Sequence, residues 1–265
     1  FRVDGQDDVQ QPAGRAASKL EVDVHVVCGQ RTRIQNPVRV VKGLGIDVED
    51  VAFNGRVAAL PILTSQLGEQ GALMIDLGAG TTEHSVYLGG AMCHTGVLAV
   101  GGEHVTNDLA VGMKLSQTRA ERLKLEHGSA VPDPRVAHRV VNFASDVGLD
   151  DKQVSVGHIQ QIMHARLDEL FQIIRADLDQ HGLLRRINGS VLLTGGGARL
   201  PQINLLAQQM FELDVCLPHE TEEAHEGGLL HQPECTAAMG LVKFGARQVR
   251  ARSHQRKGLL GWLTN

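Results

Sequence analysis

Two glycine-rich turns in this sequence carry residue types that hold phosphorylated ligands. In the first, DLGAGTT, Asp76 ends a short apolar run and is followed by two glycines and two threonines, Gly78, Gly80, Thr81 and Thr82. Glycines let backbone N–H groups form a concave anion site, and threonines add hydroxyl groups. Asp76 is placed to hold a hydrated divalent cation beside the phosphates. A tight turn capped by an Asx-type hydrogen bond explains the same residues without a ligand.

The second turn, TGGGAR, joins a buried-looking strand to a helix. Gly195, Gly196 and Gly197 leave the backbone bare at the amino end of this helix, where a ligand can lie against the chain. Arg199 carries a planar guanidinium that can stack on an aromatic base. An ordinary strand-to-helix loop with a surface arginine is the alternative, although such a loop does not need three consecutive glycines.

Hydrophobic patterning indicates that strands surround the first turn. Apolar stretches over residues 72–75, 85–88 and 91–98 predict a strand, a glycine turn, a second strand, a hairpin and a third strand. Gly89 and Gly90 are the two-residue signature of that hairpin. A dinucleotide-binding fingerprint and a Walker loop are excluded, because both need their glycine turn to open a helix.

The periodicity of the apolar residues predicts the other elements of an α/β architecture. Residues 20–27 alternate strictly and predict a half-buried strand, and residues 190–194 predict a buried one. Helices are expected over five segments: 36–42, 55–66, 118–127, 159–178 and 201–213. Thr118 and Glu121 have the spacing of a capping box at the start of the third helix.

The composition is typical of a folded globular protein. The chain has 265 residues, of which 42% are hydrophobic and 21% charged, so one or two domains are expected. The net charge of −4 offers no basic surface for a nucleic-acid backbone, and an aromatic content of 3% leaves few side chains on which bases could stack. We therefore expect no nucleic-acid partner.

The cysteines and histidines suggest no metal centre. The four cysteines lie far apart without CxxC pairing, which argues against a zinc ribbon and against a disulfide framework. His219, His225 and His231 lie among glutamates with Cys235 nearby, but spacings of six residues fit no common ligand pattern. A solvated acidic loop is the favoured interpretation of that segment.

Residues 251–265 read as a basic amphipathic tail. Arg256 and Lys257 precede four apolar residues, Leu259, Leu260, Trp262 and Leu263. In a helix, three of these share one face, which is the pattern of a helix that lies in a lipid interface. A disordered tail that docks on its own domain is the alternative. No apolar run approaches the roughly 20 residues of a membrane span.

Taken together, the two glycine turns resemble those of the actin-like ATPase superfamily, and within it the sequence is most similar to the FtsA family of bacterial cell-division proteins. The resemblance covers about residues 21–245. It is carried by five segments, NPVRVVKGLGIDVEDVAFNGRVAAL, YLGGAMCHTGVLAVGGEHVTNDLA, AERLKLEHGSA, VLLTGGGARLPQINLLAQQMF and PECTAAMGLVKFG. It implies an α/β, ribonuclease-H-like actin fold, incomplete in this chain, with two lobes around a nucleotide cleft.

The resemblance also implies a division of the chain. Residues 1–30 would be the remnant of a subdomain specific to the FtsA family. Residues 31–69 and 233–250 would belong to lobe I, and residues 70–232 to lobe II, with 116–157 as its outer subdomain. Small residues in the late helix would permit close helix crossing at a hinge, and residues 251–265 would be the membrane-targeting tail. The family's amino-terminal part is missing, so we expect a fragment.

The family's nucleotide site maps onto residues of this chain as a site for ATP and Mg²⁺. Asp76 would order the waters of the metal ion. The remaining nucleotide-binding positions are, in chain order, Gly78, Gly80, Thr81, Thr82, Gly101, Gly102, Glu121, Lys124, Gly195, Gly196, Gly197 and Arg199. Of these, Glu121 and Lys124 would hold the ribose, and the triple-glycine turn with Arg199 would hold the adenine. No catalytic residue is assigned.

The implied function is mechanical. FtsA-like proteins bind ATP, assemble into filaments or dimers with themselves, and tether FtsZ to the cytoplasmic membrane surface through the carboxyl tail. The expected location is therefore the cytoplasmic face of the inner membrane at the division septum. The FtsZ-contacting residues are placed loosely within residues 116–157.

Four departures from the family pattern bear on activity. Ala79, Glu83 and His84 replace the family's usual residues, and the first phosphate loop of the family lies in the missing part. We expect at most a weak ATPase in a longer parent, and no hydrolysis by this chain. A nucleotide-free adaptor that keeps only partner contacts is one alternative. A sugar-kinase-like phosphotransferase is another, although no residue set for a substrate base or a sugar pocket is visible.

Overall fold

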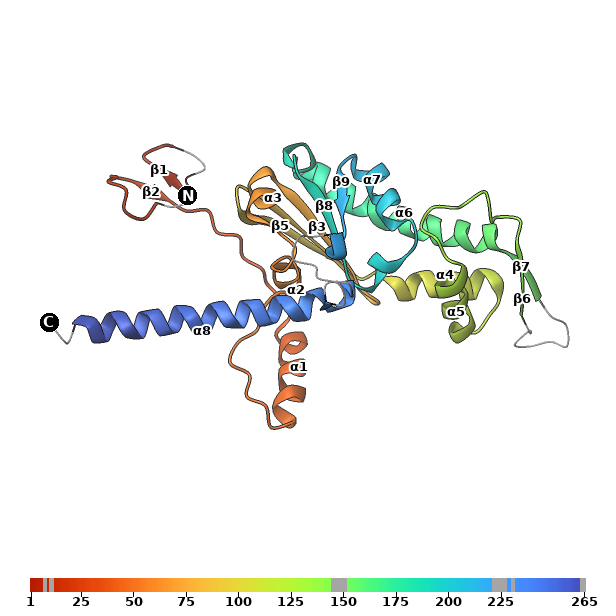
Figure 1. Ribbon diagram of the computed structural model, residues 1–265, viewed down its shortest axis with the longest axis horizontal. Coiled ribbons are helices and arrows are strands. Elements are labelled where there is room, and N and C mark those ends of the chain that lie inside the picture. The colour runs from red at the N-terminus through yellow and green to blue at the C-terminus, as the bar shows by residue number, and fades with distance from the viewer. Residues whose placement is uncertain (7–8, 10–11, 144–151, 221–227, 230–231, 263–265) are drawn as a thin grey trace.

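The fold is described from a computed structural model (Figure 1). The described residues are 1–6, 9, 12–143, 152–220, 228–229 and 232–262. A central five-stranded sheet lies in the middle of an elongated molecule, with helices on both faces. One long helix and an amino-terminal hairpin extend away from the sheet in the same general direction.

The sheet has the strand order β5-β4-β3-β8-β9. β3 (Ala72–Leu77), β4 (Thr82–Leu88) and β5 (Ala91–Leu98) form an antiparallel meander, which confirms the predicted succession of strands and turns. Gly89 and Gly90 have φ angles of 57° and 79°, the left-handed values that the hairpin turn requires. β8 (Ser190–Thr194) lies parallel to β3, and β9 (Asp214–Cys216) lies parallel to β8.

Four helices build the larger hydrophobic core. The long helix α6 (Val156–Gln180) and α7 (Ile203–Phe211) pack on one face of the sheet, while α4 (Gly102–Met113) and α5 (Gln117–His127) pack beside α6 beyond the sheet edge. The predicted amphipathic helix over residues 159–178 is thus confirmed, and it ends before Gly182, whose φ is 63°. The helix predicted from residue 201 begins at Ile203, after a 3-10 turn.

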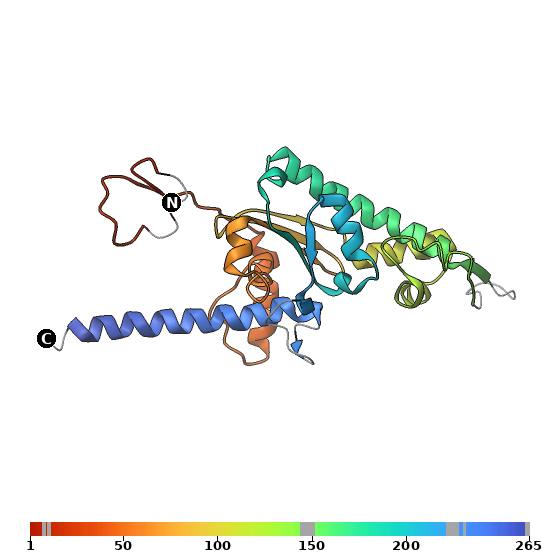
Figure 2. The ribbon, with the colours of Figure 1, turned by 45° about the horizontal axis from the view of Figure 1, so that its top comes forward.

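A smaller core lies on the opposite face of the sheet (Figure 2). It is covered by α2 (Asn54–Val57), α3 (Ser65–Gln70) and the first turns of α8 (Thr236–Trp262). Because successive strand residues point to opposite faces, Leu73 and Ile75 enter the larger core and Met74 enters the smaller one. Burial on both faces explains why β3 reads as a continuous apolar run.

Helix α8 crosses α2 at very short range and then runs clear of the sheet. A Cβ atom on Gly240 would lie 1.8 Å from the carbonyl oxygen of Val57, so only glycine permits this approach. The predicted close helix crossing at this segment is therefore confirmed. Of the predicted lipid-facing residues, Leu259, Leu260 and Trp262 belong to α8, and Leu263 lies outside the described residues.

Two predicted helices differ from those observed. The helix over 36–42 begins earlier, as α1 (Arg31–Gly43), and contains Pro37 rather than starting at it. The helix over 55–66 is divided into α2 and α3, because Pro61 has no N–H to continue the hydrogen-bonded ladder. The side chain of Thr64 accepts a hydrogen bond from the N–H of Leu67 at 3.2 Å and starts α3 anew.

The predicted strand over residues 20–27 is mostly wrong. Only β2 (Leu20–Glu21) pairs, with β1 (Arg2–Val3), and no described strand lies beside residues 22–27. Val22, Val24 and Val26 are exposed, so the alternating pattern has no described layer to pack against.

The remaining elements are short. β6 (Val140–Phe143) and β7 (Lys152–Ser155) form a hairpin at the far end of the α4–α6 layer. Single 3-10 turns span Leu184–Arg186, Gly196–Arg199, Pro218–Glu220 and Pro233–Cys235. Within the described ranges, no helix is both long enough and apolar enough to cross a membrane. His225 and His231, considered above as metal ligands, lie outside the described residues.

Candidate functional site

The two glycine turns meet at one edge of the sheet. β3 and β8 are parallel neighbours, with Asp76 in register with Thr194, so the turns that follow them leave the sheet together. A Cβ atom on Gly195 would lie 2.3 Å from Oδ1 of Asp76, and the φ angle of Gly195 is 81°. Glycine is therefore required where the second turn passes over the carboxyl group of the first.

The first turn presents unengaged N–H groups to solvent. Its own closure is a hydrogen bond from the N–H of Gly78 to the carbonyl oxygen of Thr81, at 3.0 Å. Ala79, Gly80 and Thr81 are exposed, and none of their N–H groups donates to another group of the described chain. Three successive free N–H groups are what an anion-binding concavity needs.

Thr82 differs from its neighbour Thr81. It is fully buried, and its hydroxyl donates to the carbonyl oxygen of Val100 at 2.8 Å. This hydrogen bond ties the start of β4 to the loop before α4. The phosphate contact of Thr82 stays a prediction.

Gly101 and Gly102, at the start of α4, lie against the backbone of the first turn. The N–H of Gly102 donates to the carbonyl oxygen of Gly78 at 3.0 Å, and a Cβ atom on Gly101 would lie 2.5 Å from that same oxygen. The N–H of Gly101 donates to Nδ1 of His104 at 3.1 Å. The amino end of α4 thus holds the turn in place through its own N–H groups. Direct nucleotide contact by the two glycines stays a prediction.

The second turn is also open to solvent. Gly196 is exposed, and the N–H groups of Gly196 and Gly197 donate to no group of the described chain. The N–H of Gly195 donates to the carbonyl oxygen of Pro233 at 3.1 Å. Arg199 forms a two-point ion pair with Glu234, with nitrogen-to-oxygen distances of 2.8 and 2.7 Å, which fixes its guanidinium on the surface.

A cavity of about 770 Å³ opens beside the first turn, between α4 and α5. Its lining comprises Ala79, Glu103, His104, Thr106, Asn107, Gln117, Thr118 and Glu121. A cavity of this volume accommodates a small organic ligand. The triple-glycine turn and Arg199 do not line it.

Glu121 and Lys124 form a hydrogen-bonded group at the wall of this cavity. Nζ of the buried Lys124 lies 2.6 Å from Oε2 of Glu121 and donates to Thr106 Oγ1 at 2.8 Å, and Thr106 Oγ1 in turn donates to Glu121. Burial alone would raise the pKa of Glu121, but the hydrogen bonds from Lys124 and Thr106 outweigh it and lower the pKa. Glu121 is therefore an ionised acceptor facing the cavity.

The predicted capping box at Thr118 and Glu121 is wrong. Helix α5 begins after Ser116, which makes no side-chain cap. Glu121 instead accepts its hydrogen bonds from α4 and from Lys124 on its own helix, so tertiary contacts decide its orientation.

Asp76 and Glu83 are cross-strand partners that share a neighbour the sequence did not reveal. Asn54, the first residue of α2, donates from Nδ2 to Oδ2 of Asp76 at 2.8 Å. Burial raises the pKa of Asp76. Burial, and then the charge of Asp76, raises the pKa of Glu83 against the opposing effect of hydrogen bonds from Gly55 and Asn54. One oxygen of this carboxyl group, the buried Oε2, has no hydrogen-bond partner in the described chain. No local spacing connects Asn54 to Asp76, so this contact lacks a sequence signal.

Glu83→Gln is expected to stabilise the chain by about 1 kcal/mol at pH 7, since it removes a half-buried carboxylate whose ionised form is disfavoured by burial and by the charge of Asp76. The pKa of Glu83 is higher in the folded state than its value of about 4.3 in the unfolded state. Between these two pKa values the folded state binds more protons than the unfolded state. The free energy of unfolding therefore falls as the pH rises through this range. The gain should vanish below pH 4. Urea unfolding at pH 7 and at pH 3.5 measures both, and an equal gain at the two pH values would contradict the charge as its cause.

Comparisons with known sequences identify close relatives. A family model described as "Cell division protein FtsA" matches residues 73–240, and one described as "SHS2 domain inserted in FTSA" matches residues 1–28. The chain is 31% identical over 251 residues to the cell division protein FtsA of Borreliella burgdorferi, covering 94% of this chain and 60% of that protein. It is 32% identical over 248 residues to that of Agrobacterium fabrum, covering 92% of this chain and 56% of that protein. The chain thus spans less than two thirds of these relatives.

Comparison with solved structures confirms the predicted fold class. MreB5 of Spiroplasma citri, in a structure bound to ADP, matches with a TM-score of 0.68 and 19% identity, covering 85% of this chain and 68% of that one. The PilM–PilN complex of type IV pilus biogenesis matches with a TM-score of 0.60 and 19% identity, covering 80% of this chain and 57% of that chain. The central sheet and its flanking helices therefore form an actin-like ATPase fold.

Proposed function

Because this chain belongs to the FtsA family of cell-division proteins, we propose that it binds ATP at the edge where the two glycine turns meet and links FtsZ to the cytoplasmic membrane. The observation that carries the nucleotide part is the contact between Gly195 and the carboxyl group of Asp76, beside free N–H groups on both turns. Two open backbone turns at the carboxyl ends of neighbouring parallel strands are a usual position for a ligand in an α/β fold.

The residues at this edge fit ATP with Mg²⁺. The N–H groups of residues 79–81 would donate hydrogen bonds to the phosphates. Glu121, oriented by Lys124, would accept hydrogen bonds from the ribose hydroxyls. The second turn, Gly195–197 with Arg199, would lie against the adenine. Asp76 would hold the waters of Mg²⁺, which supplies neutralising charge to the phosphates when bound. A nearby cation would also favour the ionised form of this desolvated carboxyl group.

The membrane part of the proposal concerns α8. The helix carries the basic and apolar tail sequence away from the sheet, which leaves its far end free to meet a surface (Figure 1). We propose a peripheral attachment at the cytoplasmic face of the inner membrane, at the division septum. FtsZ would bind at the opposite end of the molecule, within residues 116–157, and copies of the chain would assemble with one another on the membrane.

A flotation assay tests the linking function. FtsZ polymers are mixed with vesicles that contain anionic lipid, with and without this chain. We expect FtsZ to float with the vesicles only when the chain is present. If the chain floats with the vesicles while FtsZ in the same mixture does not, the link is refuted and the membrane contact stands.

Trp262→Glu is expected to reduce vesicle binding about tenfold, because it removes the largest apolar side chain of the tail and adds a charge that anionic lipid repels. Val242→Glu is the matched control. It places the same charge on the same helix at a side chain that is 74% exposed, but within the part near the sheet. Equal loss of binding in both variants would show that the tail is not the attachment point.

The alternative function is that of an adaptor that binds FtsZ and the membrane but no nucleotide. The engaged hydroxyl of Thr82 and the ion pair of Arg199 are the features that favour it. A chain that recruits FtsZ to vesicles but binds no ATP in the titration below would establish it.

A further inference from the structure

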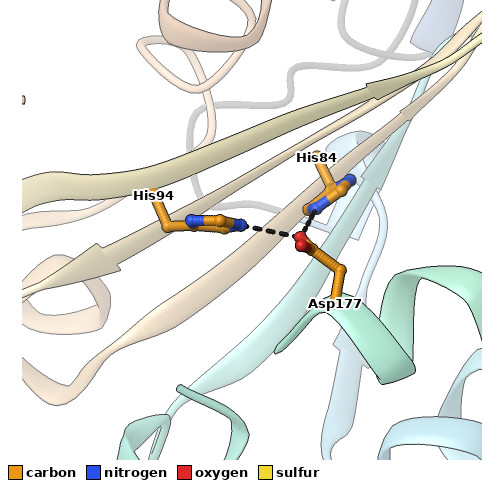
Figure 3. Close-up of side chains that lie close together, drawn as sticks. All are labelled: His84, His94 and Asp177. Carbon is orange, nitrogen blue, oxygen red and sulfur yellow. Dashed lines mark hydrogen bonds and ion pairs between the residues drawn. The ribbon is translucent and has the colours of Figure 1, made fainter. Parts of the chain in front are cut away.

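Three side chains from separate elements converge on the face of the sheet that α6 covers (Figure 3). His84 comes from β4, His94 from β5 and Asp177 from α6. Nε2 of each histidine lies 2.7 Å from the same oxygen, Oδ2 of Asp177. One potential ligand atom from each residue lies within 4.8 Å of the other two. Two imidazoles and a carboxylate thus meet here although 93 residues of sequence separate His84 from Asp177.

This cluster is separate from the nucleotide edge. Along β4, Glu83 points toward α2 while His84 points toward α6, because strand residues alternate between faces. The cross-strand neighbour of His84 is Gly96, and a Cβ atom there would lie 2.2 Å from Cε1 of the imidazole ring. The absence of a side chain at position 96 therefore creates the space that the His84 ring occupies.

We propose that His84, His94 and Asp177 bind a divalent transition-metal ion, for which Zn²⁺ is the natural probe. Two imidazole nitrogens and one carboxylate oxygen form a common ligand set for such ions, with a fourth position left for water or another ligand. Ligand atoms around a tetrahedral Zn²⁺ lie about 3.3 Å apart, from bond lengths of roughly 2.0–2.1 Å. Each nitrogen now lies 2.7 Å from Oδ2, which is about 0.6 Å less than the separation in such a site.

The environment of the cluster differs between its members. Burial lowers the pKa of His84 and outweighs the opposing effect of Asp177. Burial alone would raise the pKa of Asp177, but the hydrogen bonds from the two histidines outweigh it and lower the pKa. Coordination through Nε2 would replace the present hydrogen bond from His84 to Asp177, and the ring proton would then lie on Nδ1, which has no partner in the described chain.

Solvent reaches the cluster from one side. His84 is only 2% exposed, whereas the side chains of His94 and Asp177 are 16% and 31% exposed. The ring of His181, the residue that follows α6, lies 4.5 Å from that of His94 between centroids. An ion bound here would join the β4–β5 hairpin to the end of α6, and thereby stabilise the fold.

Titration of the 265-residue chain with Zn²⁺ by calorimetry tests the proposal. We expect one ion per chain at this site and a rise in the thermal unfolding midpoint. His94→Gln and Asp177→Asn should each weaken binding by at least about 100-fold, since each removes a ligand. His158→Gln is the control, because His158 is an exposed histidine on the same helix and far from the cluster. Co²⁺ in place of Zn²⁺ should give the visible absorption of a tetrahedral site.

Gly96→Ala provides a second variant that removes no ligand. It should weaken Zn²⁺ binding by displacing the His84 ring, with the folded state checked by circular dichroism. Absence of Zn²⁺ binding by the unsubstituted chain would overturn the proposal and leave a purely structural hydrogen-bonded triad. Binding that survives both His94→Gln and Asp177→Asn would equally overturn it, since the ion would then lie elsewhere.

Discussion

Gly80→Asp is expected to weaken binding of Mg·ATP to this chain by about 100-fold while leaving the fold unchanged. Gly80 is exposed, and no heavy atom lies within 4 Å of a Cβ atom placed on it, so an aspartate fits without displacing a neighbour. Its carboxylate would lie over the free N–H groups of the first turn and repel the phosphates. Two like charges about 4 Å apart near a protein surface repel each other by a few kcal/mol, so a loss of roughly 2–3 kcal/mol in binding free energy is expected.

Fluorescence anisotropy with a labelled ATP measures this effect. Gly80→Ala tests the added methyl group without charge and should change affinity only slightly. Gly43→Asp is the charge-matched control, because Gly43 is also exposed with open space around it and lies at the end of α1. Equal binding by Gly80→Asp and the unsubstituted chain would remove the first turn from the nucleotide site. Absence of binding by the unsubstituted chain would support the nucleotide-free adaptor.

Gly240→Ala is expected to destabilise the chain by about 2–3 kcal/mol, the scale of forcing an extra carbon into a packed interface. The added methyl group would lie 1.8 Å from the carbonyl oxygen of Val57, so α8 must shift away from α2 and open the smaller core. Denaturant unfolding followed by circular dichroism measures the loss, and protease cleavage at the base of α8 should become faster.

Gly245→Ala supplies the opposite expectation within the same helix. Gly245 is exposed and has no atom within 4 Å of an added Cβ, so alanine should stabilise α8 by about 0.5–1 kcal/mol through helix propensity. Helix propensity alone would make both variants more stable. A destabilised Gly240→Ala beside a stabilised Gly245→Ala therefore isolates the crossing as the cause, and equal effects of the two would contradict it.

The sequence predicted the parts of the site that depend on local pattern. The meander around Gly89 and Gly90 was readable because strand periodicity and hairpin chemistry agree there, and the position of Asp76 followed from the end of an apolar run. The parallel pairing of β3 with β8 then brought the two turns together.

Contacts between distant segments could not be predicted in this way. Asn54 reaches Asp76 from a helix of four residues, and the His84–Asp177 pair spans 93 positions, so neither leaves a periodic signal. The capping box predicted at Glu121 is wrong for a related reason. The Glu121 side chain accepts a hydrogen bond from Thr106 on another helix instead of one from the start of its own helix. The alternation of residues 20–27 meets no described layer to pack against, and only Leu20–Glu21 pairs as a strand.

The seat of α8 has a mechanical consequence. The carbonyl oxygen of Pro233 accepts hydrogen bonds from the N–H of Gly195 and from the hydroxyls of Thr194 and Thr236, so the triple-glycine turn and the root of α8 share one anchor atom. About 33 Å of helix separates Gly240 from Trp262, at 1.5 Å per residue. A tilt of roughly 10° at the root would therefore swing the tip by about 6 Å. The first residue of the helix is therefore linked to the second glycine turn through the Pro233 carbonyl group, and the other end of the helix carries Trp262.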